Sequence, residues 1–150
     1  MIYTPLQPSV YSLGGIALAL GMIVVAKFYS KIMTVDYFYK ISLLVELVVL
    51  FLLVYFLVFS YNYLSALIVY AGYQLTFTFG SYLIRAETLF LSRSSILSML
   101  DIAKQKGYLL GMVLSYVFYT LLEKVYDISD KQDQVYLLHF GLLLVEIFTL

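Results

Sequence analysis

The sequence predicts an all-α fold: a polytopic membrane bundle of about five transmembrane helices that forms one domain over residues 1–150. Composition is the first reason, because 63% of the residues are hydrophobic and 12% are charged. Soluble domains carry about 45–50% apolar and about 25% charged residues. The mean hydropathy of +0.97 agrees with this. The second reason is the length of the apolar runs, and the third is the placement of the basic residues.

The expected membrane-spanning helices follow from five apolar runs. These runs are 11–28, 41–59, 64–84, 107–123 and 135–150. A spanning helix needs about 20 residues, within a range of about 17–25. The second and third runs meet that length directly, whereas the fifth is short and stops on Leu150 without a polar flank. Packing of this last helix in an assembly and truncation of a longer chain are both open explanations.

The segment 86–106 is predicted to be an amphipathic cytoplasmic linker. Ser94, Ser98, Asp101 and Gln105 recur at helical spacing and form a polar stripe, with apolar residues on the opposite side. Such a helix lies on a membrane surface or extends the next crossing.

The charges of the loops predict the orientation of the chain. Seven of the nine basic residues fall in the loop after the first run and in the segment around 85–106; they are Lys27, Lys31, Lys40, Arg85, Arg93, Lys104 and Lys106. The positive-inside rule places these segments in the cytoplasm, the N-terminus outside and the C-terminus inside. The expected location is therefore the plasma (inner) membrane, in a multi-pass protein whose solvent is the lipid bilayer. Tyrosines at run ends, Tyr82 among them, are expected to form an aromatic belt.

Two carboxylic acids lie inside the apolar runs and are the first candidate functional residues. A charged carboxylate at mid-helix costs about 2.5–3.5 kcal/mol on insertion scales, so Glu46 and Glu146 must face protein or a wet cavity. His139 lies two turns before Glu146 on the same helix face, and the two could relay protons. Glu46 lies close to the cytoplasmic end of its run, where an ion pair with Lys40 or Lys27 is the favoured interpretation.

Two polar-aromatic helix faces are candidates for binding a small-molecule solute. Tyr70, Tyr73 and Gln74 share one face of the third run, and Tyr116 and Thr120 share one face of the fourth. Together they could line an aqueous path, or they could form interhelical hydrogen bonds without any ligand. Small residues spaced four apart mark expected close helix contacts; they are Gly15, Ala19, Gly72, Thr76, Gly80, Gly107, Gly111 and Ser115.

Several function classes find no support in the sequence. The formal net charge is zero, so nucleic acid is not an implied partner. There is no cysteine, and one histidine with glutamates is too sparse for a metal site. No nucleophile–base pairing, phosphate-binding loop or nucleotide motif occurs, so we expect neither an enzyme nor a cofactor.

The stretch GSYLIRAETLFLSRSSILSMLDIAKQKGYLLGMVLSYVFY, residues 80–119, together with the loop pattern, resembles the N-terminal half of a major facilitator superfamily transporter. The resemblance implies that the five runs correspond to helices two to six of that half. It implies a transporter-derived protein that moves or once moved a small solute, with a missing second half or a homo-oligomer as partner. The alternative is a small structural or accessory membrane subunit that packs with partner helices and transports nothing itself.

Overall fold

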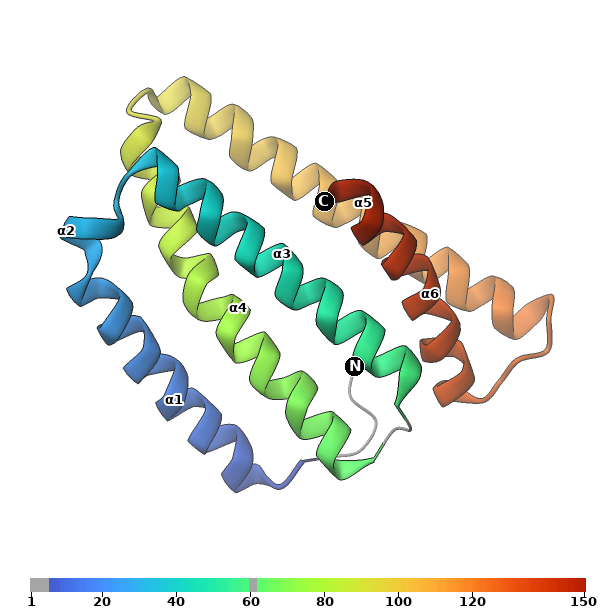
Figure 1. Cartoon of the computed structure of the whole chain (residues 1–150). Helices are drawn as coiled ribbons and strands as arrows, with labels where there is room; N and C mark the ends of the chain where they lie inside the picture. The colour runs from blue at the N-terminus through green and yellow to red at the C-terminus, as the bar shows by residue number, and fades with distance from the viewer. Residues whose placement is uncertain (1–5, 60–61) are drawn as a thin grey trace.

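The computed structural model describes residues 6–59 and 62–150, and the expected all-α fold is confirmed. Its helices are α1 (Pro8–Lys27), α2 (Tyr29–Ile32), α3 (Val35–Val58), α4 (Tyr63–Phe90), α5 (Ser94–Lys124) and α6 (Lys131–Thr149) (Figure 1). The five long helices cover the five apolar runs except for the last residue of the first, second and fifth runs, Phe28, Phe59 and Leu150. The expected linker 86–106 is divided: residues 86–90 end α4, residues 91–93 connect the two helices, and residues 94–106 open α5, which continues without a break into the fourth run.

Three helices in the described part of the chain, α1, α3 and α4, are long and apolar enough to cross a membrane. At 1.5 Å per residue, the 24 residues of α3 reach about 36 Å, against a hydrocarbon layer of about 30 Å. The large apolar side chains lie mostly on the outside, uncovered by the rest of the chain. A continuous apolar exterior is rare on soluble monomers, so these helices fit a membrane protein. The crossing itself stays a prediction for these three helices, and likewise for α5 and α6.

Polar side chains cap the starts of α3, α4 and α6. The Asn62 side chain accepts from the Ser65 backbone N–H at 2.9 Å, and the Ser65 hydroxyl accepts from the Asn62 N–H at 2.8 Å. This reciprocal pair satisfies two otherwise unpaired donors at the start of α4. The Asp130 carboxylate does the same for α6 by accepting from the N–H groups of Gln132 and Asp133. These caps fix where each helix begins.

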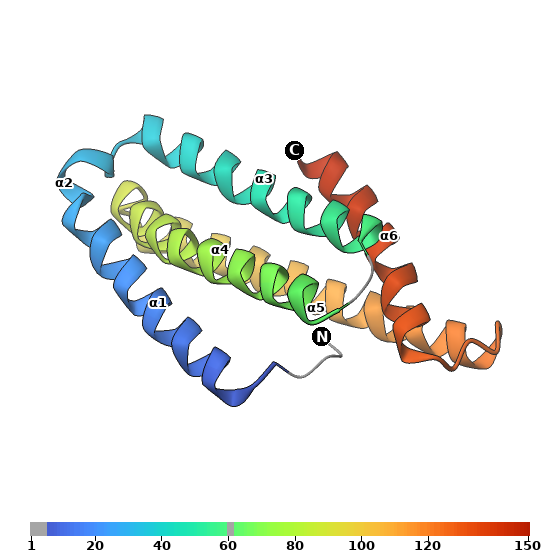
Figure 2. The same ribbon diagram turned by 60° about the horizontal axis from the view of Figure 1, so that its bottom comes forward.

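The helices pack in the spatial order α1, α4, α3, α6, α5, which differs from their order in the sequence. Figure 2 shows α4 between α1 and α3, with α6 crossing the far end of α3. Close approaches occur at glycines: a Cβ on Gly14 would meet the Tyr70 ring, and one on Gly72 would meet Leu52. Gly72 is an expected contact. Gly15 and Gly80, also expected at close contacts, face open space instead.

The most deeply buried cluster lies at the α2 end of the bundle. Tyr82 and Ala86 of α4 are fully buried there against Ile41 of α3. The Tyr82 hydroxyl donates a 2.6 Å hydrogen bond to the carbonyl oxygen of Ile32, at the C-terminal end of α2. The expectation that Tyr82 belongs to an aromatic belt is therefore wrong. Its ring lies in the core, and its hydroxyl donates to the Ile32 carbonyl oxygen, which has no hydrogen-bond partner within α2.

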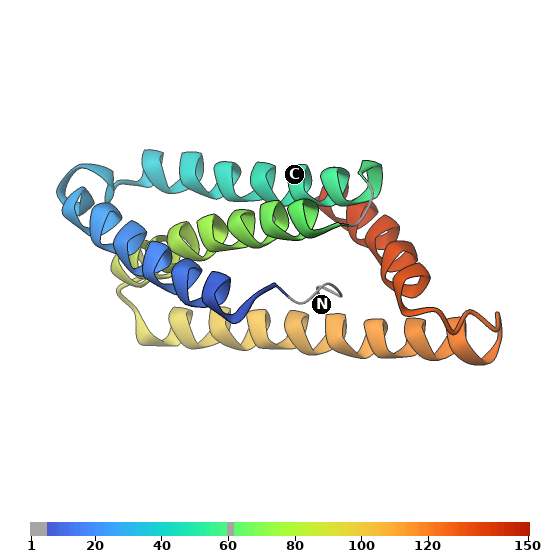
Figure 3. The same cartoon turned by 90° about the horizontal axis from the view of Figure 1, so that it is seen from below.

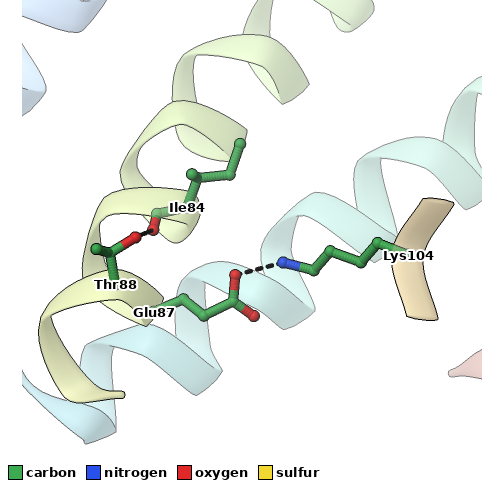
Figure 4. A network of polar contacts seen from close by, with 4 residues as sticks. All are labelled: Ile84, Glu87, Thr88 and Lys104. Atoms are coloured by element: carbon green, nitrogen blue, oxygen red, sulfur yellow. Dashed lines mark hydrogen bonds and ion pairs between the residues drawn. The ribbon is translucent and has the colours of Figure 1, made fainter. Parts of the chain in front are cut away.

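Helix α5 stands apart from the others over much of its length. Residues 101–114 are all exposed, and Figure 3 shows α5 running below the α1–α4–α3 layer until α6 returns from its end to α3. An ion pair between Lys104 of α5 and Glu87 of α4 links the two helices (Figure 4). Because this pair is partly exposed, it contributes little to stability.

Candidate functional site

The interface between α3 and α6 carries the candidate site, and its register is set by two contacts. The Tyr136 hydroxyl donates to the Leu57 carbonyl oxygen at 3.2 Å. One turn further along α6, the His139 ring stacks on Phe56, with ring centroids 4.0 Å apart and planes 23° apart. Both contacts join the start of α6 to the end of α3, so the two helices run antiparallel. Later residues of α6 must therefore lie against earlier residues of α3.

This register brings together the two acids that lie inside the apolar runs. Glu146 lies seven residues after His139, and Glu46 lies ten residues before Phe56. The Glu146 carboxyl group lies close enough to the Glu46 carboxyl group for the two to interact electrostatically. Both side chains are half-buried. The sequence marks each acid separately as one that must face protein, and in the structure each faces the other.

Two neighbouring carboxyl groups can share one proton. Two ionised carboxylates side by side repel each other, which disfavours the doubly charged state. Oε1 of Glu146 is buried and has no hydrogen-bond donor among the described residues. A proton on either carboxyl group would supply a donor, and a buried acceptor without one costs about 1–3 kcal/mol. The arrangement is therefore chemically suited to holding and releasing a single proton.

His139 lies on the same helix face but is not part of the pair. Its Nδ1 is 2.7 Å from the carbonyl oxygen of Val135, one turn earlier in α6. That contact requires a proton on Nδ1, which leaves Nε2 as the acceptor in a neutral ring. Two helical turns, about 10.5 Å along the axis, separate His139 from Glu146. A direct histidine–glutamate relay is therefore not formed, and Phe56 holds the ring in place.

The expected ion pair between Glu46 and a lysine is also not formed. Lys40 instead lies over the Tyr37 ring, 5.6 Å from its centroid. Across residues 6–59 and 62–150, the ion pair that the structure contains joins Lys104 to Glu87. Glu46 interacts instead with Glu146 of α6.

The first candidate solute-binding face lies between α1 and α4. The Tyr70 hydroxyl donates to the Tyr11 carbonyl oxygen at 3.2 Å, and the two rings meet edge to face. Gln74 lines an apolar groove of about 400 Å³ with residues of α1, and its Oε1 is buried without a hydrogen-bond donor in the described chain. Tyr73 remains 41% exposed. Tyr70 is thus a packing residue, and Gln74 is an unsatisfied polar group.

The second candidate face is not joined to the first. Tyr116 is 73% exposed. The Thr120 hydroxyl bonds to the Tyr116 carbonyl oxygen within its own helix, at 2.8 Å. The closely packed helix pairs of the described chain include α5·α6 but not α4·α5. In this structure the two faces therefore do not enclose one path.

A further polar groove, which sequence reasoning missed, lies at the α2 end of α4. It has a volume of about 650 Å³ and is lined by Tyr29, Ser81, Arg85 and Thr88, among others. The sequence contains a pattern that could have revealed this groove, because Ser81, Arg85 and Thr88 follow i, i+4, i+7 spacing and share one helix face.

The described residues contain no cluster of three side chains suited to a metal ion. No family model, curated protein or solved structure matches the chain.

Proposed function

We propose that this chain is a multi-pass membrane protein of the plasma (inner) membrane that forms part of a proton-coupled transporter for a small solute. The observation that carries the proposal is the Glu46–Glu146 pair, which lies between two apolar helices. Ionisable residues at such positions are rare and mark proton relays or substrate pathways in membrane proteins. The resemblance to the major facilitator superfamily points to the same class of function.

In this proposal, proton binding at the Glu46–Glu146 pair is coupled to a movement of α6 relative to α3. With one proton bound, the two carboxyl groups attract each other across the α3–α6 interface. Without it, two negative charges face each other in a poorly screened site and favour separation of α6 from α3. A ligand shifts an equilibrium only through a difference in affinity between two states. Here the proton binds the closed α3–α6 interface better than an open one, which links its binding to a helix movement.

The solute site is proposed on the Tyr70, Tyr73 and Gln74 face together with Tyr116 and Thr120. The buried, unsatisfied Oε1 of Gln74 supports a polar ligand on that face. Transporters of the resembled family bind solute between two halves that rock against each other. A path that includes Tyr116 would need α5 to approach α4, or another half to cover both faces.

Infrared spectroscopy of the full chain in lipid tests the proton site directly. We expect a band from a protonated carboxyl group near neutral pH that is lost in both Glu46→Gln and Glu146→Gln. The control, Glu123→Gln, alters an exposed acid at the end of α5 and should keep the band. A wild-type spectrum without the band, or a band that survives both substitutions, would refute a shared proton.

Transport is tested separately in liposomes that contain the chain and a pH-sensitive dye. Single solutes from a panel of sugars, amino acids and organic acids are added across an imposed pH gradient. We expect at least one to drive proton movement, and Glu146→Gln to abolish it. A panel without any response would favour the second candidate function.

That second candidate is an accessory membrane subunit, and the exposed face of α5 favours it. Gly107 and Gly111 have no atom within 4 Å of a Cβ position, so neither contacts another helix of this chain. Small residues four apart let helices approach closely in lipid. A cysteine at Gly111 should then crosslink to a partner helix, from a second copy or a different subunit. Monomeric behaviour of that variant in membranes would count against the accessory role.

A further inference from the structure

The groove around Arg85 extends beyond the hollow at the α2 end of α4. A second hollow, of about 620 Å³, shares Tyr29, Ser81 and Arg85 with the first and extends along α1 toward Ala19 and Met22. The two together form one groove on the outer side of α1 and α4, called here the Arg85 groove. Its polar residues lie mainly where the two hollows meet, and most of the remaining lining is apolar, both along α1 and at the α2 end.

The polar part of the groove contains the Arg85 guanidinium, which has N–H donors available for a ligand. The Arg85 guanidinium lies over the Tyr29 ring, 5.9 Å from its centroid, and the Ser81 hydroxyl lines the same hollow. Glu87, the neighbouring acid, is paired with Lys104 instead (Figure 4). Within the described residues no carboxylate neutralises Arg85. A planar guanidinium with uncommitted N–H groups suits a phosphate group.

The end of the groove along α1 is apolar, and α1 is one of the helices that could cross a membrane. Ala19, Met22 and Ile23 line it, and all three are exposed on α1. Thr78 also lines this hollow, but its hydroxyl donates to the Gln74 carbonyl oxygen within α4. A chain of methylene groups would cover these side chains and continue toward Arg85.

The depth of Arg85 matches the boundary between these two chemistries. The 28 residues of α4 extend about 42 Å, close to the thickness of about 40–45 Å of a bilayer with its headgroups. Arg85 lies five residues before the end of α4, so about 7.5 Å inside it. That places the guanidinium in the headgroup layer, with Ala19 and Met22 deeper in the hydrocarbon.

We propose that the Arg85 groove binds one anionic phospholipid of the leaflet at the α2 end of the bundle. The phosphate of the headgroup accepts from the Arg85 guanidinium and the hydroxyls of Ser81 and Tyr29. An acyl chain covers Ala19 and Met22 on α1. Basic pockets between transmembrane helices on the cytoplasmic side bind anionic headgroups in this way. The occupant is a lipid because a free phosphate would leave the apolar half of the groove uncovered. The site is independent of proton transfer at Glu46 and Glu146.

Native mass spectrometry of the full chain in detergent tests the site, with phosphatidylglycerol and phosphatidylcholine as probes. We expect one phosphatidylglycerol to bind about fivefold more tightly than phosphatidylcholine, the factor that a single basic residue contributes near an anionic surface. Arg85→Gln should remove this preference. Arg93→Gln, an exposed basic residue that does not line the groove, should retain it. Ala19→Phe should fill the apolar half and weaken binding of both lipids.

Three outcomes would overturn the proposal. The first is a wild-type chain without preference for phosphatidylglycerol, a measurement that needs no variant. The second is equal loss of preference in Arg85→Gln and Arg93→Gln, which would indicate a diffuse surface charge effect. The third is displacement of the bound lipid by inorganic phosphate together with normal lipid binding by Ala19→Phe, which would indicate a plain anion site. Unfolding temperatures of the variants, expected to equal that of the wild type, verify that each remains folded.

Discussion

The hydroxyl of Tyr82 and the carbonyl oxygen of Ile32 are joined by a 2.6 Å hydrogen bond across 50 residues of sequence. This bond ties the middle of the chain to the short helix α2, which is too short to be stable alone. The Tyr82 ring fills the centre of the only cluster of core residues that gathers α1, α2, α3 and α4 in the described structure. The α2 end of the bundle therefore depends on one side chain.

Tyr82→Phe should lower the free energy of unfolding by about 0.5–1.5 kcal/mol, the net value of one hydrogen bond. The lower half of that range is expected, because the Ile32 carbonyl also accepts from the Thr34 N–H at 2.8 Å. Tyr82→Ala should cost about 3–5 kcal/mol, because it empties a fully buried site. Thermal unfolding in detergent measures both. Tyr73→Phe, at a side chain that is 41% exposed, is the control and should have no effect.

Substitution of Gly14, but not of its neighbour Gly15, should disturb the α1–α4 contact. A Cβ at Gly14 would meet the Tyr70 ring and displace its hydrogen bond to Tyr11, whereas a Cβ at Gly15 meets nothing within 4 Å. We expect Gly14→Ala to destabilise by about 1–3 kcal/mol, the usual cost of overpacking. Gly15→Ala should be neutral or slightly stabilising.

A double-mutant cycle decides whether the Gly14 effect comes from Tyr70. In Tyr70→Ala the ring is absent, so adding Gly14→Ala should cost much less than it does in the wild type. Additive costs in the double mutant would show that the strain arises elsewhere.

Gln74→Leu separates stability from function at the candidate solute face. Removing a buried oxygen that lacks a donor should stabilise the chain by about 1 kcal/mol. If Gln74 binds solute, the same variant should lose solute-driven proton movement in liposomes. A destabilised Gln74→Leu would instead mean that the amide has a structural hydrogen bond in the membrane, and the solute assignment would lose its support.

The predicted orientation can be measured without background labelling, because the chain contains no cysteine. Single cysteines at Ser95 and at Asp127 lie at opposite ends of α5. A membrane-impermeant thiol reagent added outside intact cells should label the Asp127 position and leave the Ser95 position unlabelled. Labelling of both would mean that α5 does not cross the bilayer, and the reverse pattern would invert the topology.

The helices were predictable from the sequence because hydropathy is a local property that marks lipid-soluble runs directly. The contacts between the helices were harder to predict from the sequence. Gly14 and Gly15 differ by one residue, or about 100° around the helix, and only the three-dimensional packing selects between them. Tyr82 shows the same limit, since a tyrosine near a run end suits both a headgroup layer and a core. The acids Glu46 and Glu146 were identifiable one at a time from their cost in hydrocarbon. Their pairing depends on the register of α3 and α6, which no local pattern contains.

The position of α1 against α4 has a consequence for how the chain is made. Two helices, α2 and α3, are synthesised between them, so the ribosome delivers α1 long before its neighbour exists. In the predicted membrane arrangement, lipid covers Gly14 and Gly21 of α1 until α4 inserts and presents Tyr70 and Thr78. The α1–α4 contact is then completed only after translation of the segment ending at Phe90.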